Sequence, residues 1–184
     1  MQLKETGIAG LIEIIPAIFK DDRGWFYEFY NENTFAKAGI TAKFVQENTS
    51  FSKKGVIRGL HFQNAPHAQG KLVTVLQGKA LDVVVDLRPD SKTFKSVYYC
   101  NLSSETRNML MVPEGFAHGF AALEDTLFAY KCTNFYNKAA ESGILWNDPE
   151  LNIKWPFTNP IVSEKDNVLS TLEELIGKSV ISRY

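Results

Sequence analysis

The chain alternates apolar and polar residues with a period of two, in short segments that are separated by turn residues. Such segments include KFVQENTS, GVIRGLHFQ, ALDVVVDLR and TLFAYKCTNFY, and the turns include KKG, NAPHAQG and QGKA. This alternation places successive side chains on opposite faces of a β-strand. Many short strands at regular spacing are typical of a sandwich or a barrel rather than of a βαβ fold. The sequence therefore predicts an all-β protein.

Two segments have helical patterns and are expected at the margins of the sheets. NENTFAKAGI is predicted to form a short helix that begins near Asn33 or Thr34 and ends at Gly39. TLEELIG places its leucines and its isoleucine on one face, and Gly177 would end that helix. There is no internal repeat and no linker rich in Pro, Gly or Ser. We therefore expect residues 1–184 to form one domain, a jelly roll with short marginal helices.

Charge and hydropathy restrict the partners and the location of the protein. The 20 basic residues nearly cancel the 21 acidic ones, which predicts neither a nucleic-acid partner nor a membrane surface. Glu13 and Pro16 interrupt the apolar run near the N-terminus, so this run is neither a signal peptide nor a membrane span. Cys100 and Cys132 are expected to be reduced core residues. A soluble cytoplasmic protein is the default expectation.

The stretch VIRGLHFQ, residues 56–63, places three polar side chains among apolar ones on a predicted strand. His61 and Gln63 share one face of this strand, and Arg58 belongs to the other face. Arg58 and His61 can point into the same cavity only if the strand is bent between them. We therefore predict a bulge or a kink at Gly59.

His61 is the best candidate for a general base, because a neutral imidazole can take up a proton near pH 7. A lone histidine in a core is more often structural, but the cationic and amide side chains close to His61 in the sequence argue against that here. A base of this kind needs a carboxylate to orient its ring. The spacing leaves four candidates for that carboxylate, namely Asp82, Asp86, Asp148 and Asp166.

Two further side chains have both a functional and an ordinary interpretation. Lys71 opens the apolar strand KLVTVL, and it could stabilise a developing oxyanion or simply lie in solvent at the strand end. Tyr130 could donate a proton to a substrate or be an aromatic core residue. The three histidines include no His-x-His pair, so no metal is predicted. Without a glycine-rich phosphate loop, a phosphate must be held by side chains such as Arg23, Arg58 and Lys165, or by backbone amides at strand ends.

A series of blocks in the sequence resembles one known family. In order, the blocks are DDRGWFYEFYN, FVQENTS, VIRGLHFQ, AQGKLV, LDVVVDLR, VPEGFAHGF, YKCTNFY, GILWNDP and SEKD. They resemble those of the dTDP-4-dehydrorhamnose 3,5-epimerase family, and the resemblance covers residues 8–170. It implies a cupin-like jelly roll that acts as a homodimer without a metal or a cofactor. The implied substrate is a dTDP-linked 4-keto-6-deoxyhexose, which is inverted at C3 and C5 in the rhamnose pathway.

The resemblance also implies roles for individual residues. His61 of RGLHFQ would remove the α-proton, and Asp166 of SEKD would orient it. Lys71 of QGKLV would stabilise the C4 enolate, and Tyr130, which precedes KCT, would return a proton from the opposite face. The implied substrate contacts are Arg23, Phe26, Glu28, Gln46, Asn48, Arg58, His118, Glu141, Lys165 and Tyr136, the last of which would stack on thymine. The early strands of this family can reach the site of a partner subunit.

Three alternatives stay open at this stage. The first is an epimerase of a related keto sugar that inverts only C3 or only C5. The second is a jelly roll that binds a sugar nucleotide without catalysis. The third is a metal-dependent cupin oxygenase.

Overall fold

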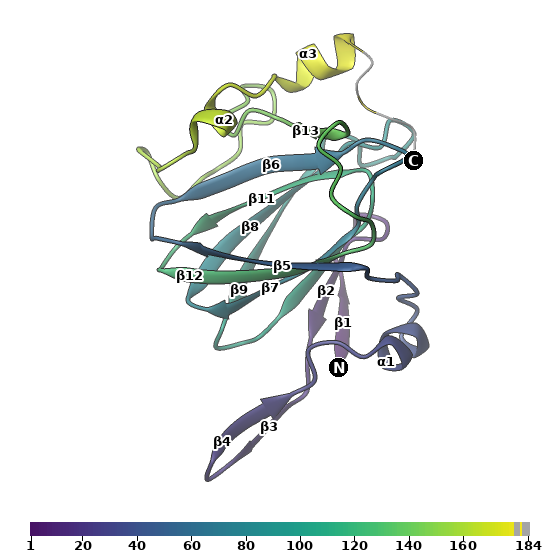
Figure 1. Ribbon diagram of the computed structural model, residues 1–184, viewed down its shortest axis with the longest axis vertical. Coiled ribbons are helices and arrows are strands. Elements are labelled where there is room, and N and C mark those ends of the chain that lie inside the picture. The colour runs from purple at the N-terminus through teal and green to yellow at the C-terminus, as the bar shows by residue number, and fades with distance from the viewer. Residues whose placement is uncertain (179–180, 182–184) are drawn as a thin grey trace.

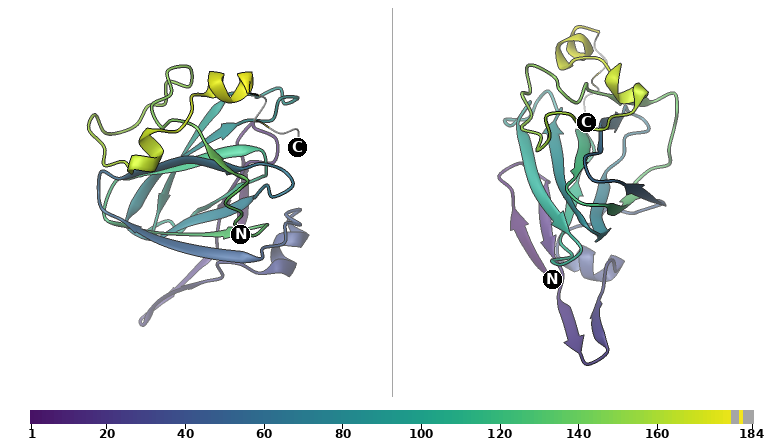
Figure 2. Two further views of the ribbon diagram at one scale, coloured as in Figure 1. Left: turned by 45° about the horizontal axis from the view of Figure 1, so that its top comes forward. Right: turned by 90° about the vertical axis from the view of Figure 1, so that its left-hand side faces the viewer.

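Two antiparallel sheets packed face to face form the body of the protein, as the computed structural model shows for residues 1–178 and 181 (Figures 1 and 2). The first sheet has the strand order β1 (Gln2–Glu5), β2 (Ile12–Ile15), β10 (Met109–Val112), β7 (Lys71–Gln77), β12 (Thr126–Cys132) and β5 (Gln46–Ser52). The second has the order β13 (Glu141–Gly143), β6 (Ile57–Gln63), β11 (Phe116–Ala122), β8 (Lys79–Asp86) and β9 (Val97–Ser103). The predicted all-β jelly roll is confirmed.

The main core lies between the inner faces of the two sheets. Val73 and Val75 of β7 pack in one buried cluster with Val84 of β8 and with Phe116 and Phe120 of β11. These residues alternate with outward-facing ones along each strand, as a period of two requires.

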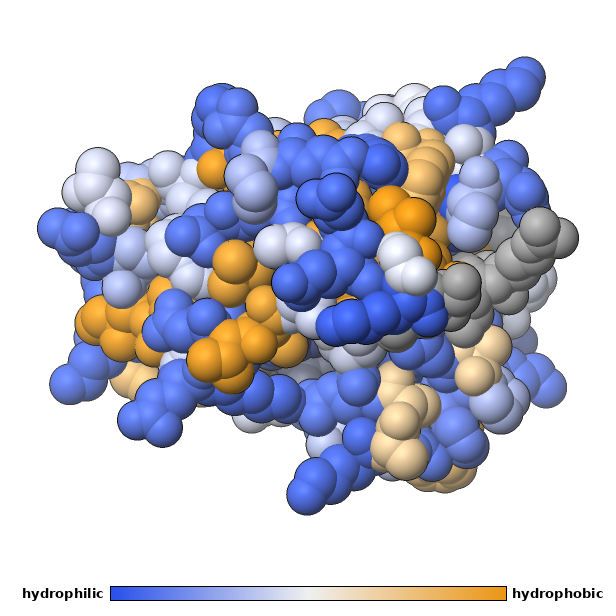
Figure 3. Space-filling model, turned by 90° about the horizontal axis from the view of Figure 1, so that it is seen from above, coloured by the Kyte–Doolittle hydropathy of each residue, from blue (hydrophilic) through white to orange (hydrophobic). Residues whose placement is uncertain are grey.

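Short helices and loops cover the outer faces of the sheets. Phe35 of α1 (Glu32–Lys37) is buried against the six-stranded sheet. Leu172 and Leu175 of α3 (Leu172–Gly177) are buried against the five-stranded sheet, together with Leu60 and Phe62 of β6. The face that carries α2 (Glu164–Asn167) and α3 is mostly hydrophilic, with hydrophobic residues in separate small patches (Figure 3).

The start of α1 and the buried face of α3 differ from the predictions, whereas α3 ends at Gly177 as expected. Asn31 caps α1, because its side chain accepts hydrogen bonds from the backbone N–H groups of Asn33 and Thr34, and the helix therefore begins earlier than expected. The prediction that Gly39 follows this helix is confirmed by its φ of +89°. In α3, Ile176 is 40% exposed, so only the two leucines share the buried face.

The apolar run near the N-terminus, LIEIIPAIF, forms two strands with different roles. β2 ends at Ile15, since Pro16 has no N–H group to continue the ladder. The chain then forms the hairpin of β3 (Ile18–Asp21) and β4 (Gly24–Tyr27), which projects away from the body (Figure 1). Phe26 on this hairpin is 68% exposed. The hairpin therefore contributes little to the core of its own chain.

Strand β6 has a bulge at Gly59, as the sequence predicted. His118 of β11 pairs with His61, whereas Phe120, two residues later, pairs with Arg58, three residues earlier. The extra residue on β6 brings both polar side chains to the same cavity. Gly59 has a φ of +117°, and a Cβ atom there would lie 2.6 Å from the Cα of Gly119. Only glycine fits this position without displacing β11.

We expect Gly59→Ala to lower the free energy of unfolding by about 3 kcal/mol, because it combines an unfavourable φ with a backbone clash. The control is Gly55→Ala, where φ is +91° but no atom lies within 4 Å of the added Cβ. That control should cost only about 1 kcal/mol. Chemical denaturation of both variants tests the difference, and equal losses would contradict a tight bulge.

Candidate active site

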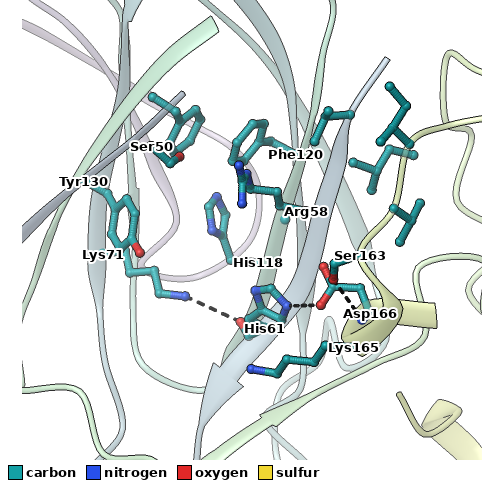
Figure 4. Close-up of a pocket in the computed structure, with 16 residues that line it drawn as sticks. Ser50, Arg58, His61, Lys71, His118, Phe120, Tyr130, Ser163, Lys165 and Asp166 are labelled. Atoms are coloured by element: carbon teal, nitrogen blue, oxygen red, sulfur yellow. Dashed lines mark hydrogen bonds and ion pairs between the residues drawn. The ribbon is translucent and has the colours of Figure 1, made fainter. Parts of the chain in front are cut away.

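A cavity of about 530 Å³ opens between the two sheets and is lined by polar side chains from both. Arg58 and His61 reach it from β6, and His118 reaches it from β11. Lys71 and Tyr130 reach it from β7 and β12 of the facing sheet (Figure 4). Lys165 and Asp166 of α2 complete the lining. The fold thus brings together all four residues that the resemblance implies as catalytic, with three of the implied substrate contacts.

His61 and Asp166 form a direct pair in this cavity. Nε2 of His61 lies 2.7 Å from Oδ1 of Asp166, whose other oxygen accepts the N–H of Gly59 at 3.2 Å. The histidine side chain is 34% exposed and that of Asp166 only 5%. The bulge in β6 therefore holds the carboxylate as well as directing His61 inward.

The short helix α2, which the sequence did not predict, positions Asp166. The hydroxyl of Ser163 caps this helix by accepting the N–H of Asp166 at 3.1 Å. A serine three residues before an acidic residue is a recognisable sign of a helix start. The block SEKD therefore carried a signal for this helix, although four residues are too few for a helical period to be read.

The environment of Asp166 keeps it ionised. Burial raises its pKa, but the hydrogen bond and charge of His61, the N–H of Gly59 and the charge of Lys165 lower it. The balance places the pKa of Asp166 below its usual value of 3.8. An ionised Asp166 can hold a proton on Nε2 of His61, which leaves Nδ1 as the ring nitrogen that can accept one.

Lys71 and Tyr130 lie on the sheet opposite His61. Nζ of Lys71 is 3.5 Å from the carbonyl oxygen of His61. Burial lowers the pKa of Lys71, and the nearby Cys132, Asp82 and Glu141 oppose this. Burial also raises the pKa of Tyr130, so its phenol stays protonated. The cavity therefore offers a cation and a neutral proton donor across from an imidazole.

Arg58 is fixed at the edge of the cavity by groups on the neighbouring sheet. Its Nε donates to the hydroxyl of Ser52 at 2.9 Å, and one terminal nitrogen donates to the carbonyl of Phe51 at 3.1 Å. Ser52 is a partner of Arg58 that the sequence did not predict. Nothing in the sequence pairs it with Arg58, because the contact depends on how the two sheets meet.

A second cluster of hydrogen-bonded polar side chains lies next to Lys165, and its members do not line the cavity. Glu141 accepts from Nζ of Lys165 at 2.6 Å and from the hydroxyl of Tyr136 at 3.0 Å. Gln46 accepts the backbone N–H of Tyr136 at 2.9 Å and donates to Asn48 at 3.1 Å. Four more of the implied substrate contacts are therefore linked to one another.

The three implied contacts near the N-terminus lie elsewhere. Arg23 and Phe26 belong to the projecting hairpin, and Glu28 follows it. Arg23 pairs with Asp21 at 2.6 Å, and Glu28 accepts from Asn31 at 2.9 Å. None of the three lines the cavity of its own chain.

The carboxylates that the spacing left open have separate partners. Asp86 accepts from Arg88, Ser91 and Thr93, and these bonds hold its pKa at about 2 although burial opposes them. Asp148 accepts backbone N–H groups, including that of Leu172 at 2.8 Å. Asp82 pairs with His118, which leaves Asp166 as the partner of His61.

Two features absent from the described residues bear on other functions. Over residues 1–178 and 181, no three His, Cys, Asp or Glu side chains are grouped as metal ligands. No helix in the same part of the chain has the length and apolar character needed to cross a membrane. Cys100 and Cys132 are free thiols in the core, as predicted.

Comparison with known proteins identifies the family. The family model described as dTDP-4-dehydrorhamnose 3,5-epimerase matches residues 5–174. The chain belongs to this family. A dTDP-4-dehydrorhamnose 3,5-epimerase from Shigella flexneri is 48% identical over 168 residues, which are 90% of this chain and 93% of that protein. The protein is therefore related to isomerases over nearly its whole length.

Solved structures of epimerases with different names have the same fold. The dTDP-6-deoxy-D-glucose-3,5-epimerase from Legionella pneumophila, solved with dTDP-4-keto-L-rhamnose, is 42% identical with a TM-score of 0.93, and 100% of this chain and 98% of that one are covered. A 3'-monoepimerase from Streptomyces bikiniensis, solved with dTDP-quinovose, is 29% identical with a TM-score of 0.90 and coverage of 96% and 91%. The fold alone therefore does not distinguish double from single inversion.

We expect Asp166→Asn to lower the free energy of unfolding by roughly 1–3 kcal/mol at pH 7. Asp166 accepts from two donors, His61 and Gly59, on two oxygens, whereas asparagine has only one acceptor oxygen. Because the folded-state pKa is lowered, this stabilisation is complete above the usual value of 3.8 and is lost as the pH falls through the folded-state value. Urea denaturation between pH 7 and pH 3 should show the two proteins converging on acidification.

The matched control is Glu164→Gln, which removes an exposed carboxylate from the same helix. It should change the stability by less than about 0.5 kcal/mol. A deficit of Asp166→Asn that stays constant down to pH 3 would argue against an ionised Asp166.

Proposed function

We propose that the protein inverts C3 and C5 of a dTDP-linked 4-keto-6-deoxyhexose, the reaction of dTDP-4-dehydrorhamnose 3,5-epimerase, and that residues 1–184 act as one domain. One observation carries the proposal. His61 of one sheet, paired with Asp166 of α2, faces Lys71 and Tyr130 of the other sheet across a single cavity. A nucleotide sugar as substrate also favours a cytoplasmic location.

The ketone of the substrate makes the reaction accessible to acid–base chemistry. Removal of the proton at C3 or C5 leaves a carbanion beside the C4 carbonyl, and its charge moves onto the C4 oxygen. Return of a proton to the opposite face inverts the carbon. The two transfers change no oxidation state, so the reaction itself calls for no redox cofactor. A base, an acid on the opposite side and a cation at the oxygen suffice.

His61 has the features of the base. Its Nε2 is held by Asp166, and its Nδ1 can take the proton from carbon. The imidazolium that forms is stabilised by the ionised carboxylate. The role of Asp166 is thus to fix the ring orientation and to balance the charge, without itself contacting the substrate.

Lys71 and Tyr130 match the two remaining roles. The ammonium of Lys71 would stabilise the C4 oxyanion, and this interaction is strong where the side chain is removed from water. The phenol of Tyr130, which burial keeps protonated, would return the proton. Because the acid and the base come from opposite sheets, they would address opposite faces of the sugar ring.

The diphosphate and the base of the nucleotide would bind at the edge of the cavity. The guanidinium of Arg58 is held in place by Ser52, and forked donors suit phosphate oxygens. Lys165 adds a second positive charge. Tyr136 is 55% exposed and could stack on thymine. Binding energy from these remote groups would hold the sugar in register with His61.

We also propose a homodimer in which the hairpin of one subunit completes the site of its partner. The hairpin projects from the body and exposes Trp25 and Phe26, which are 56% and 68% accessible. Large exposed aromatic side chains on a projecting element favour contact with another chain. Arg23, Phe26 and Glu28 would then reach a substrate held by the partner.

The reaction is tested by incubation with the keto sugar in deuterated water. We expect deuterium at both C3 and C5, measured by NMR and mass spectrometry, because each inversion passes through a carbanion that takes up solvent hydrogen. Label at one carbon alone would identify a single-site epimerase. No label in a folded sample that binds dTDP would favour a non-catalytic binding protein.

The two proton-transfer roles are separated by a pair of variants. His61→Asn should slow solvent exchange at both carbons by roughly a hundredfold or more, because it removes the base. Tyr130→Phe should slow net epimerisation more than exchange, since the proton is still removed but is returned poorly. Rapid-quench assays in deuterated water measure both rates. Equal losses of the two rates in Tyr130→Phe would contradict its role as the donor.

The shared site is tested by mixing inactive variants. His61→Asn lacks the base, and the double variant Arg23→Ala, Glu28→Ala lacks hairpin contacts. In a mixed dimer, one site would combine a complete hairpin from one chain with His61 from the other. Random pairing should restore roughly a quarter of the wild-type activity. If no activity returns, the hairpin does not act across the dimer.

A further inference from the structure

A second imidazole–carboxylate pair lies beside the site, between β11 and β8. Nε2 of His118 is 2.8 Å from Oδ2 of Asp82. The side chain of His118 is 9% exposed and that of Asp82 is fully buried. In the strand register, His118 lies directly opposite His61. The ring of His118 lines the cavity (Figure 4), whereas Asp82, its hydrogen-bond partner, is not among the residues that line it.

Asp82 lacks the hydrogen bonds that a buried carboxylate normally has. Its Oδ1 is buried and has no hydrogen-bond partner in the part of the chain that the structure describes. Asp86, on the same face of the same strand, accepts from Arg88, Ser91 and Thr93. A buried, incompletely paired carboxylate oxygen destabilises the fold. The hydrogen bonds of Asp86 therefore account for its burial as a stabilising group of the fold. Asp82 has no such set of bonds, so its burial has no comparable structural reason.

The charged groups around Asp82 connect it to the cavity. His118 faces it from β11, Cys100 lies opposite it on β9, and Lys71 interacts with its charge from β7. Burial lowers the pKa of Lys71, while Cys132, Asp82 and Glu141 raise it. An ammonium that must stay charged in a buried site needs an anion nearby. Of Cys132, Asp82 and Glu141, only Asp82 is a fully buried carboxylate.

We propose that Asp82 is a positioning residue of the reaction. It acts on the substrate through two neighbours, the ammonium of Lys71 and the imidazole of His118. Its charge keeps Lys71 protonated for the enolate. Its hydrogen bond keeps a proton on Nε2 of His118 and thereby presents Nδ1 to the substrate. The proposal rests on the proposed function, since it assigns Asp82 to the oxyanion side of that same site.

The test is the pH profile of Asp82→Asn. Activity requires the protonated form of Lys71, so the alkaline limb of kcat reports the pKa of Lys71 in the complex. Burial raises the pKa of Tyr130 and lowers that of Lys71, so Lys71 is expected to lose its proton first. Removal of the Asp82 charge lowers the pKa of Lys71 further, and the alkaline limb should move to lower pH by roughly one unit.

The kinetic constants provide a second measurement. We expect kcat of Asp82→Asn to fall at least about tenfold at pH 8, because fewer molecules hold a charged Lys71 and the tautomer of His118 changes. The Kd for dTDP should stay within about twofold, because Asp82 does not line the cavity. A purely structural residue would change the melting temperature without moving the alkaline limb.

The matched control is Asp86→Asn. Asp86 is also a buried carboxylate, and it lies four residues after Asp82 on the same face of β8. The control variant should lower the melting temperature and leave the alkaline limb in place. An unshifted limb in Asp82→Asn, with activity in the wild type, would overturn the proposal and leave the proposed function intact. An inactive wild type would instead overturn the proposed function.

The wild-type protein provides a test that needs no variant. In nitrogen-15 spectra, Nε2 of His118 should carry a proton throughout pH 6–9, because Asp82 accepts from it. A neutral His118 with its proton on Nδ1 would overturn the assignment. This measurement can overturn the proposal even if Asp82→Asn does not fold.

Discussion

The hydrogen bond between His61 and Asp166 is the interaction on which the rest of the site depends. It joins β6 of the five-stranded sheet to α2, two elements separated by more than a hundred residues in the sequence. The bond forms only because β6 bulges at Gly59 and because Ser163 starts a helix that carries Asp166. Local backbone geometry at two places thus sets the position of one proton-accepting nitrogen.

The arrangement of two facing sheets explains why the remaining groups lie where they do. The base enters the cavity from one sheet, and the cation and the phenol enter from the other. A substrate between the sheets therefore meets different chemistry on its two faces, which inversion of a carbon requires. The same sheets remove Lys71 from water, and this makes its charge both more effective and more costly to maintain.

The sequence predicted the parts of the structure that depend on local periodicity. The bulge at Gly59 followed from strand parity, because Arg58 and His61 had opposite parities. The partner of His61 could not be chosen by spacing among four aspartates, since the contact joins distant segments. The family resemblance implied Asp166, and the hydrogen bond is in place in the structure. Ser52 gave no comparable signal, because its partner Arg58 lies on the facing sheet. Nothing in the spacing paired Asp82 with His118, which lies on the neighbouring strand β11.

The proton on His61 tests the account most directly. Nitrogen-15 NMR of the free protein distinguishes the two neutral tautomers of His61. We expect a proton on Nε2, held by Asp166, and an unprotonated Nδ1 that can accept a proton from carbon. A proton on Nδ1 would contradict the account, because His61 would then have no free nitrogen in the cavity to act as the base.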